Sequence, residues 1–159
     1  MWETQKAELR KDIRSRLKAM PEEEKRILDR EIAERVLGLP EIAETKAVYG
    51  YASLSWEAGT REVLEELRAQ KYIICLPKVT GETMEFFVTE SEQDLSEGSF
   101  HIMEPKNGCR KADETRSEIL RTAPILVPGM GFVETGARLG KGGGFYDRYL
   151  EQHAGHMTV

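Results

Sequence analysis

Apolar residues that recur at helical spacing predict two helices at the start of the chain. The first covers residues 4 to about 18 and carries an apolar stripe at every fourth position, formed by Leu9, Ile13 and Leu17. A second helix begins at Pro21, because proline and the three glutamates behind it favour a first turn. Gly38 and Pro40 end this helix, and its apolar face comprises Ile27, Leu28, Ile32, Val36 and Leu37.

Short apolar runs bounded by turn residues predict strands in the rest of the chain. These runs cover residues 47–51, 72–76, 84–88 and 124–128. The turn residues Thr80-Gly81-Glu82 separate the second run from the third, so we expect these two strands to pair antiparallel. Thr60 is placed to cap a helix from Arg61 to about Ala69, and a short helix fits between Ala112 and Leu120.

Strands that alternate with helices indicate an α/β protein. We predict one domain over residues 1–159, built as a three-layer sandwich with a mainly parallel central sheet and helices on both faces. Ligands of such sheets bind beyond the carboxyl ends of the strands. A loop that contains Glu57 follows the strand at Val48, and a glycine-rich loop follows the strand at 125–127. We therefore expect both loops at the same edge of the sheet.

The glycine-rich loop is the segment with the densest candidate chemistry. Five of the fourteen glycines lie between Gly136 and Gly144, with Arg138 and Lys141 among them, and a helix begins near Phe145. Glycines let backbone N–H groups turn together toward a ligand, and a helix start adds unpaired N–H groups with partial positive charge. This combination predicts a phosphate-binding site.

Asp147 lies in the first turn of that helix, where its carboxylate could hold a divalent ion bound to phosphates. The segment differs from the two common phosphate loops. Gly142 stands where a Walker loop has Ser or Thr, and Phe145 stands where the dinucleotide fingerprint has its last glycine. A flexible linker is the alternative, although linkers are usually rich in serine and lack embedded Arg, Tyr and Asp.

Composition and charge narrow the class of protein. With 40% hydrophobic and 32% charged residues and a net charge of −5, the chain has the composition of a soluble globular protein without a general nucleic-acid footprint. No apolar run approaches membrane-spanning length and the first residues are charged, which favours the cytoplasm. The two cysteines and three histidines form no zinc-ligand pattern, and the apolar run around Cys75 predicts a buried thiol.

The N-terminal helix carries a second candidate for anion binding. Lys6 and Arg10 are one helical turn apart, so both side chains can point at one ligand. A solvated basic face is the alternative for these two residues and for the other cations of the helix.

Several motifs occur in an order that resembles one enzyme family. They are, in chain order, Lys6-Ala7-Glu8-Leu9-Arg10, Glu57 with Thr60, Leu76-Pro77-Lys78, Met84-Glu85-Phe86, Ile102-Met103-Glu104-Pro105, Val127-Pro128-Gly129-Met130-Gly131-Phe132 and Gly136 to Leu150. Together they resemble the 5-formyltetrahydrofolate cyclo-ligase family, and they span nearly all of the chain.

The chain departs from the pattern of that family at several positions. Val133 and Ala123 stand where the family commonly has Asp, and Gly59 replaces a second acid of the substrate loop. Phe100 takes the place of a common Trp. Family members also usually continue for some tens of residues beyond the glycine-rich helix, so we expect the sheet to lack a C-terminal strand.

The resemblance implies the cofactors and the role of each site residue. ATP and Mg²⁺ would be the cofactors, with Asp147 as the metal ligand and with Arg138 and Tyr146 as catalytic residues. Tyr146 would face the substrate together with Glu57, whose carboxylate would accept hydrogen bonds from a pterin ring, and with Phe100, which would wall the folate pocket. The residues expected to bind ATP are Lys6, Arg10, Arg138, Gly140, Lys141, Gly142, Gly143, Gly144, Phe145, Tyr146 and Asp147, of which Lys141 occupies a position that varies in the family.

The implied reaction is the ATP- and Mg-dependent conversion of 5-formyltetrahydrofolate, with or without a polyglutamate tail, to 5,10-methenyltetrahydrofolate, with release of ADP and phosphate. We expect a monomer rather than an oligomer, and no nucleic-acid or membrane partner. Two alternatives stay open. One is a non-catalytic ATP- and folate-binding remnant or truncated paralogue, which the acids lost at Val133 and Ala123 motivate. The other is a phosphosugar-binding α/β protein of similar architecture.

Overall fold

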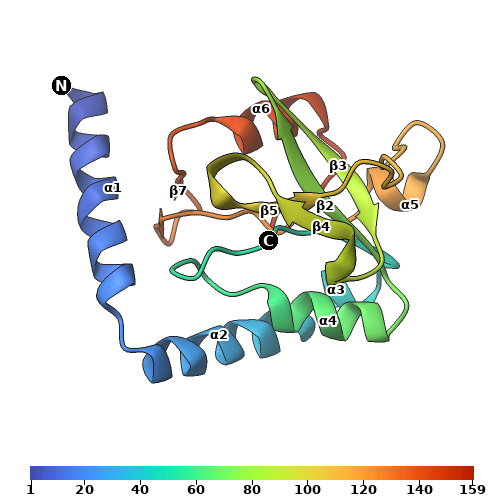
Figure 1. The fold of residues 1–159 in the computed structure, drawn as a ribbon, viewed down its shortest axis with the longest axis horizontal. Helices are drawn as coiled ribbons and strands as arrows, with labels where there is room; N and C mark the ends of the chain where they lie inside the picture. The colour runs from blue at the N-terminus through green and yellow to red at the C-terminus, as the bar shows by residue number, and fades with distance from the viewer.

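A three-stranded mixed sheet forms the centre of the protein (Figure 1). The computed structural model describes residues 1–159. β1 (Ala47–Tyr49) pairs in parallel with β2 (Ile73–Thr80), and β2 pairs antiparallel with β3 (Thr83–Thr89). The strand runs predicted from the sequence therefore form one sheet in the order β1-β2-β3.

Two further segments extend this sheet beyond β1. Tyr49 forms a parallel bridge with Ile125, and Ile125 forms another with Thr158. The amide of Val127 also donates a hydrogen bond to the carbonyl of Val159 at 2.9 Å. Residues 157–159 are therefore the outermost segment on this side of the sheet.

The prediction of a mainly parallel sheet is not confirmed. Seven residue pairs join β2 and β3 in antiparallel register, whereas three pairs join β1 and β2 in parallel register. The turn at Thr80-Gly81-Glu82 explains the difference, because Gly81 adopts a φ of 63° and reverses the chain within a tight hairpin. The predicted antiparallel pairing of these two strands is confirmed.

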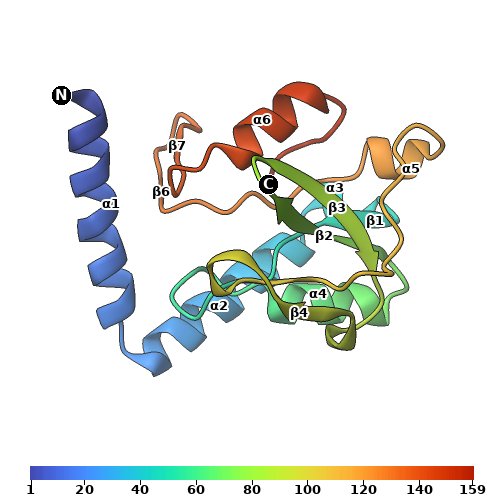
Figure 2. The same ribbon diagram turned by 45° about the horizontal axis from the view of Figure 1, so that its top comes forward.

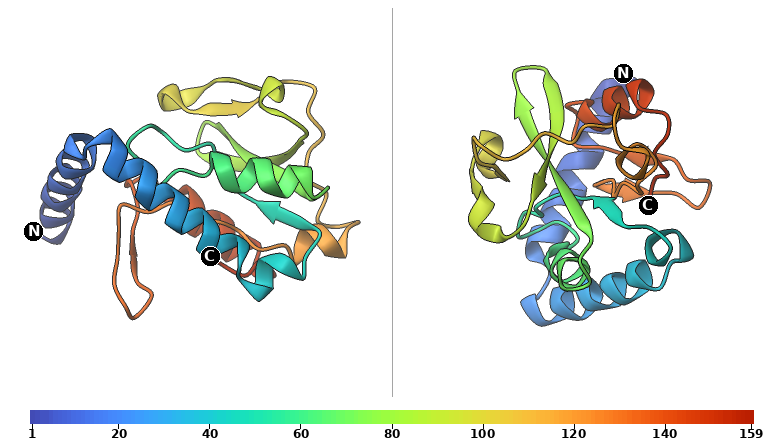
Figure 3. Two further views of the ribbon diagram at one scale, coloured as in Figure 1. Left: turned by 90° about the horizontal axis from the view of Figure 1, so that it is seen from below. Right: turned by 90° about the vertical axis from the view of Figure 1, so that its right-hand side faces the viewer.

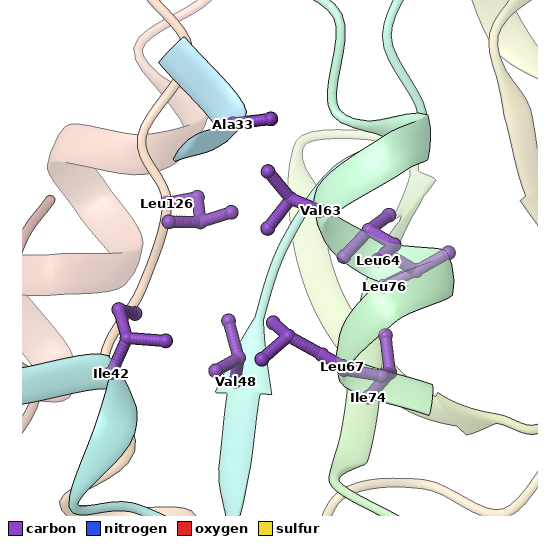
Figure 4. Close-up of a cluster of buried hydrophobic side chains, with 9 residues drawn as sticks. All are labelled: Ala33, Ile42, Val48, Val63, Leu64, Leu67, Ile74, Leu76 and Leu126. Atoms are coloured by element: carbon purple, nitrogen blue, oxygen red, sulfur yellow. The ribbon is translucent and has the colours of Figure 1, made fainter. Parts of the chain in front are cut away.

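One face of the sheet packs against α2 (Glu22–Leu37), α3 (Pro40–Ala43) and α4 (Arg61–Ala69). Val48 and Ile74 point to this face and are 0% exposed, since alternate strand residues share a side of the sheet. Figure 4 shows how the cluster closes around them. Its other members are Ala33, Ile42, Val63, Leu64, Leu67, Leu76 and Leu126.

The opposite face packs against α5 (Glu118–Arg121) and α6 (Phe145–Gln152). Cys75 points to this side, and burial raises the pKa of its thiol to about 12. The predicted buried thiol is thus confirmed, and it is unreactive at neutral pH because the thiolate is the nucleophilic form. The other buried members of this cluster are Ala47, Tyr49, Met84, Phe86, Leu120, Ala123, Ile125 and Tyr149.

α1 (Trp2–Ala19) stands apart from both clusters and has no buried residue. Figures 1 and 3 show it at one end of the molecule, joined to α2 at a sharp change of direction. Leu9, from the predicted apolar stripe, is 50% exposed. The expected helix is confirmed, but helical periodicity alone did not reveal that Leu9 stays accessible while Ile13 and Leu17 are partly buried. The same holds for Ile27 and Ile32 of α2, which are 47% and 40% exposed.

Two small hairpins complete the fold. β4 (Leu95–Glu97) pairs with β5 (Met103–Pro105), and β6 (Gly131–Phe132) pairs with β7 (Arg138–Leu139). In Figure 2 the β6–β7 hairpin lies between α1 and α6. Short 3₁₀ turns at Glu92–Asp94 and Ser99–His101 flank β4. No helix of the chain combines the length and apolar character needed to cross a membrane.

Two local predictions need correction. Thr60 occupies the N-cap position of α4, but its hydroxyl donates to the carbonyl of Tyr51 instead of accepting from the helix. The side chain therefore anchors the loop after β1 and does not cap the helix. The helix expected between Ala112 and Leu120 is reduced to α5, because Ser117 caps it late, accepting a hydrogen bond from the amide of Leu120 at 3.2 Å.

Candidate functional site

A cavity of about 280 Å³ collects every site residue that the sequence predicted. It is bounded by α1, the loop after β1, the β4–β5 hairpin, the glycine-rich turn and the start of α6. A larger hollow of about 910 Å³ lies between β3, residues 110–117 and α6, and it contains none of these residues. The predicted residues that line the smaller cavity are Lys6, Arg10, Glu57, Phe100, Arg138, Gly140, Lys141, Gly142, Gly143, Gly144, Phe145, Tyr146 and Asp147.

The glycine-rich turn presents backbone groups to the cavity. Gly142 and Gly144 adopt φ values of 111° and 69°, which other residues rarely tolerate, and Gly144 is the N-cap of α6. The carbonyl of Gly143 accepts a hydrogen bond from the Arg148 guanidinium at 2.9 Å, and residues 144–147 line the cavity. The unpaired N–H groups of the first turn of α6 therefore border the cavity, as the prediction of an anion site requires.

The side chain of Arg138 is 17% exposed, compared with 32% for Lys6 and 34% for Lys141. One of its terminal nitrogens donates to the carbonyl of Pro128 at 2.8 Å. The other donates to a carboxylate oxygen of Asp147, also at 2.8 Å. The guanidinium thus links the end of the 124–128 segment to the first turn of α6 and fixes the turn between them.

Asp147 is engaged by Arg138 in this structure, and its side chain is 79% exposed at the cavity rim. No group of three or more His, Cys, Asp or Glu side chains is placed to hold a metal ion. The role of Asp147 as a metal ligand therefore stays a prediction. Its observed contact is the ion pair with Arg138.

α1 reaches the cavity through its two predicted cations. Arg10 donates from Nε to the carbonyl of Gly140 at 2.8 Å, which ties the helix to the glycine-rich turn. Lys6, one turn earlier, pairs with Glu3 at 3.3 Å and lies over the ring of Trp2. Both side chains line the cavity, so the predicted alternative of a wholly solvated basic face does not describe these two residues.

Glu57 is a buried acid in the loop after β1, with 8% of its side chain exposed. Its carboxylate accepts a hydrogen bond from the amide of Leu54 at 2.6 Å and forms an ion pair with Lys141 of the glycine-rich turn. Lys141 also lies over the ring of Trp56. The two loops that the sequence placed at one edge of the sheet are therefore in direct contact.

This ion pair predicts a measurable loss of stability in Lys141→Met. Removal of the cation leaves the buried Glu57 carboxylate with the Leu54 amide as its one remaining donor, so we expect the free energy of unfolding to fall by about 1–2 kcal/mol. Urea denaturation measures the change. Lys111→Met is the matched control, because the Lys111–Glu85 pair is 60% and 49% exposed and should contribute about 0.5 kcal/mol or less. Equal losses in both variants would contradict the prediction.

The apolar half of the cavity was missed by the sequence reasoning. Its lining comes from β2, β3, β5 and the residue before it, β7, the loop after β1 and the end of the 124–128 segment: Tyr51, Ala52, Pro77, Val79, Met84, Ile102, Glu104, Pro128 and Leu139. Position relative to the strands could have identified one of these residues. Tyr51, like Glu57, follows the carboxyl end of β1, where ligands of such sheets bind.

Tyr146 and Phe100, two of the predicted substrate-facing residues, also line the cavity. Burial raises the pKa of Tyr146, and the nearby Tyr51 and Glu57 raise it further, so the phenol stays protonated and can donate a hydrogen bond. Phe100 lines the cavity with a φ of 59° and is 74% exposed. The structure places it at the rim rather than in the wall.

These features define a class of protein: a single mixed α/β domain whose sheet edge carries the predicted anion site beside a partly apolar cavity. We refer to this predicted site, the turn from Gly140 to Gly144 with the first turn of α6, as the anion cradle. The sequence matches the profile of the 5-formyltetrahydrofolate cyclo-ligase family over residues 3–159. The chain therefore belongs to this family of ligases, as its motifs predicted.

Individual relatives agree with the family match. The chain is 26% identical to a 5-formyltetrahydrofolate cyclo-ligase of Mus musculus, covering 95% of this chain and 76% of that protein. It is 29% identical to that of Escherichia coli K12, covering 92% and 80%. The solved structure of 5,10-methenyltetrahydrofolate synthetase from Aquifex aeolicus superposes with a TM-score of 0.77 at 30% identity, covering 97% of this chain and 76% of that one. A relative from Arabidopsis thaliana is named as mitochondrial, so the compartment of this chain stays a prediction.

Proposed function

We propose that the chain converts 5-formyltetrahydrofolate to 5,10-methenyltetrahydrofolate with consumption of ATP. The observation that carries the proposal is that the anion cradle and the buried acid Glu57 line one cavity and are joined through Lys141. A phosphate donor and an acceptor that offers N–H groups would then lie side by side. Neither the remnant nor the phosphosugar-binding alternative gains support from the relatives.

The ATP phosphates would occupy the polar half of the cavity. The unpaired N–H groups at the start of α6 and the backbone of Gly140 to Gly144 would bind the phosphate oxygens, because fixed dipoles need no reorganisation when charge moves. Lys6 and Arg10 would close the site from α1, and Arg138 would stabilise the charge that develops on the transferred group.

The carboxylate at the cradle fits a magnesium ion. Mg²⁺ is usually held by one or two carboxylates together with waters and substrate phosphates, and Asp147 offers one accessible carboxylate in the first turn of α6. When bound, the ion would neutralise phosphate charge. Asp147 would then exchange its contact with Arg138 for the ion, which would leave the guanidinium free to bind phosphate.

The folate would occupy the apolar half. A pterin ring presents adjacent N–H donors, and the Glu57 carboxylate could accept them once Lys141 turns toward phosphate. The protonated Tyr146 hydroxyl would donate to the substrate, and Met84, Val79 and Ile102 would cover its apolar surface.

The chemistry explains why one cavity must hold both molecules. The formyl oxygen is a poor leaving group until it is phosphorylated, after which N10 can close the ring and release phosphate. The protein therefore needs to position the formyl oxygen in line with the terminal phosphate and to neutralise its charge. We expect the substrate to be the small-molecule folate with or without a polyglutamate tail, and the enzyme to act as a monomer in the cytoplasm.

A spectrophotometric assay tests the proposal. The chain is mixed with Mg-ATP and 5-formyltetrahydrofolate, and the near-ultraviolet absorbance of the methenyl product is followed. We expect ATP-dependent growth of that band, and a loss of about 100-fold or more in its rate with Asp147→Ala. Glu151→Ala, an exposed acid on the same helix, serves as the control and should keep full activity. A folded wild-type chain that binds ATP without forming product would overturn the proposal in favour of the remnant.

A further inference from the structure

Glu104 is a second buried acid of the cavity, and none of the roles described so far uses it. It lies in β5, is 6% exposed and lines the apolar half of the cavity beside Val79 and Ile102. Glu57, the other buried acid, is neutralised by Lys141. Glu104 forms no ion pair with any cation of the chain, so the two acids differ in what they can do.

The hydrogen bonds of Glu104 are incomplete. A carboxylate has about four acceptor positions, and Glu104 receives one protein donor, the amide of Val79 in β2 at 3.3 Å. An ionised carboxylate that is buried with so few donors is costly unless a ligand supplies the missing hydrogens. The structure therefore presents an acceptor that a donor in the cavity can satisfy.

The β4–β5 hairpin is shaped around this side chain. A Cβ at Gly98, at the end of β4, would lie 2.3 Å from Oε2 and 2.9 Å from Cγ of Glu104. The absence of a side chain at this position lets the carboxylate fold between the hairpin and β2. Any larger residue at Gly98 would force the carboxylate to move.

We propose that Glu104 is the base that accepts the N10 proton during ring closure. This inference rests on the proposed function, because closure is the one step of that reaction in which a nitrogen must lose a hydrogen. Both buried acids of the cavity accept one backbone amide, but only Glu57 has a cation beside it that opposes protonation, and Glu104 has none.

The step balances as follows. The N10 lone pair attacks the carbon of the phosphorylated formyl group and forms the N10–C bond, while the N10–H proton passes to the Glu104 carboxylate. The bond from that carbon to the phosphate oxygen then breaks, and its electron pair leaves with phosphate. The methenyl cation remains, and Glu104 returns its proton to water. No oxidant or reductant is required.

The test is the pH dependence of kcat in Glu104→Gln. The amide oxygen can still accept from the Val79 amide, so the fold should survive, and thermal unfolding checks it. We expect kcat to fall by about 100-fold or more while the KM for ATP changes by less than about threefold. In the wild type, protonation of the base should lower kcat at acid pH. We expect this decline to be absent from Glu104→Gln, which has no carboxylate to protonate.

Two further variants separate chemistry from structure. Glu97→Gln changes an exposed acid of the same hairpin that pairs with His101, and it should leave kcat unchanged. Gly98→Ala keeps the Glu104 carboxylate but displaces it, and it should lower kcat by about tenfold or more. If the wild type is active and Glu104→Gln has the same kcat, the inference is wrong while the proposed function stands. The same holds if kcat of the variant is lower but still declines at acid pH as in the wild type. A wild type that forms no product would overturn the proposed function and this inference with it.

Discussion

Arg138→Lys is expected to lower the rate of methenyl formation by about 100- to 1,000-fold, the cost of one fixed donor at a developing charge. The planar guanidinium holds the Pro128 carbonyl with one nitrogen and Asp147 with another, each at 2.8 Å. A lysine ammonium is a single point charge and cannot span both partners. Steady-state kinetics with Mg-ATP and 5-formyltetrahydrofolate measures the loss.

The control for this variant is Arg116→Lys, since the Arg116 side chain is 88% exposed and lies outside the cavity. It should keep the wild-type rate. Thermal unfolding of Arg138→Lys separates a catalytic loss from a folding loss, because a folded variant must still lose activity. An Arg138→Lys enzyme within about threefold of the wild-type rate would show that the guanidinium serves the turn and not the reaction.

The largest loss of stability is expected for Glu114→Gln, with a decrease in the free energy of unfolding of about 2–4 kcal/mol. Glu114 lies outside the cavity and receives four donors with a side chain that is 13% exposed. The hydroxyls of Tyr49 and Tyr149 donate at 2.8 and 2.6 Å, and the imidazoles of His153 and His156 lie at 2.6 and 2.8 Å. A glutamine offers one acceptor oxygen and turns its NH₂ group toward groups that also donate.

The same cluster predicts how stability depends on pH. Burial acts to raise the pKa of Glu114, but the hydrogen bonds from Tyr149, His153, Tyr49 and His156 outweigh it, so the pKa is lowered in the folded state. The stabilisation is thus complete above the unfolded pKa of about 4.3 and is lost as the pH falls through the lower folded value. Urea unfolding between neutral and acid pH should show a steeper acid loss in the wild type than in Glu114→Gln.

Glu118→Gln is the matched control, because this acid is exposed four residues further along the chain and should change stability by about 0.5 kcal/mol or less. If wild type and Glu114→Gln lose stability in parallel on acidification, the four donors do not hold the carboxylate in its ionised form. The prediction for the cluster would then be wrong even if the variant is less stable at neutral pH.

Local chemistry in the sequence was enough to predict the conformation of the glycine-rich turn. Glycines with positive φ and a following helix start are properties of a contiguous segment, and Gly142 and Gly144 have those conformations in the structure. The hairpin between β2 and β3 was predictable for the same reason, because Gly81 determines its turn. Glu57 is distant in the chain, but the predicted topology already placed its loop at the same sheet edge as the glycine-rich loop. Lys6 and Arg10 lie on a separate helix, and the motif order of the family was needed to group them with the glycine-rich turn.

Interactions between distant segments could not be read from these patterns. Periodicity marked Leu9 and Ile27 as apolar positions but did not specify how much of each would be covered, and both stay about half exposed. Glu104 and Glu114 look like ordinary surface acids in the sequence, since the donors around each come from elements tens of residues away.

The sequence by itself thus determined the secondary structure near its turns, the family and the cavity residues that its motifs contain. The tertiary structure alone decided that Lys141 neutralises Glu57, that Arg138 holds Asp147 and that Glu104 has acceptor positions to spare. The physical reason is that hydrogen-bond and ion-pair partners are chosen by distance in space. Only the folded chain brings β2, the β4–β5 hairpin and the glycine-rich turn around one cavity.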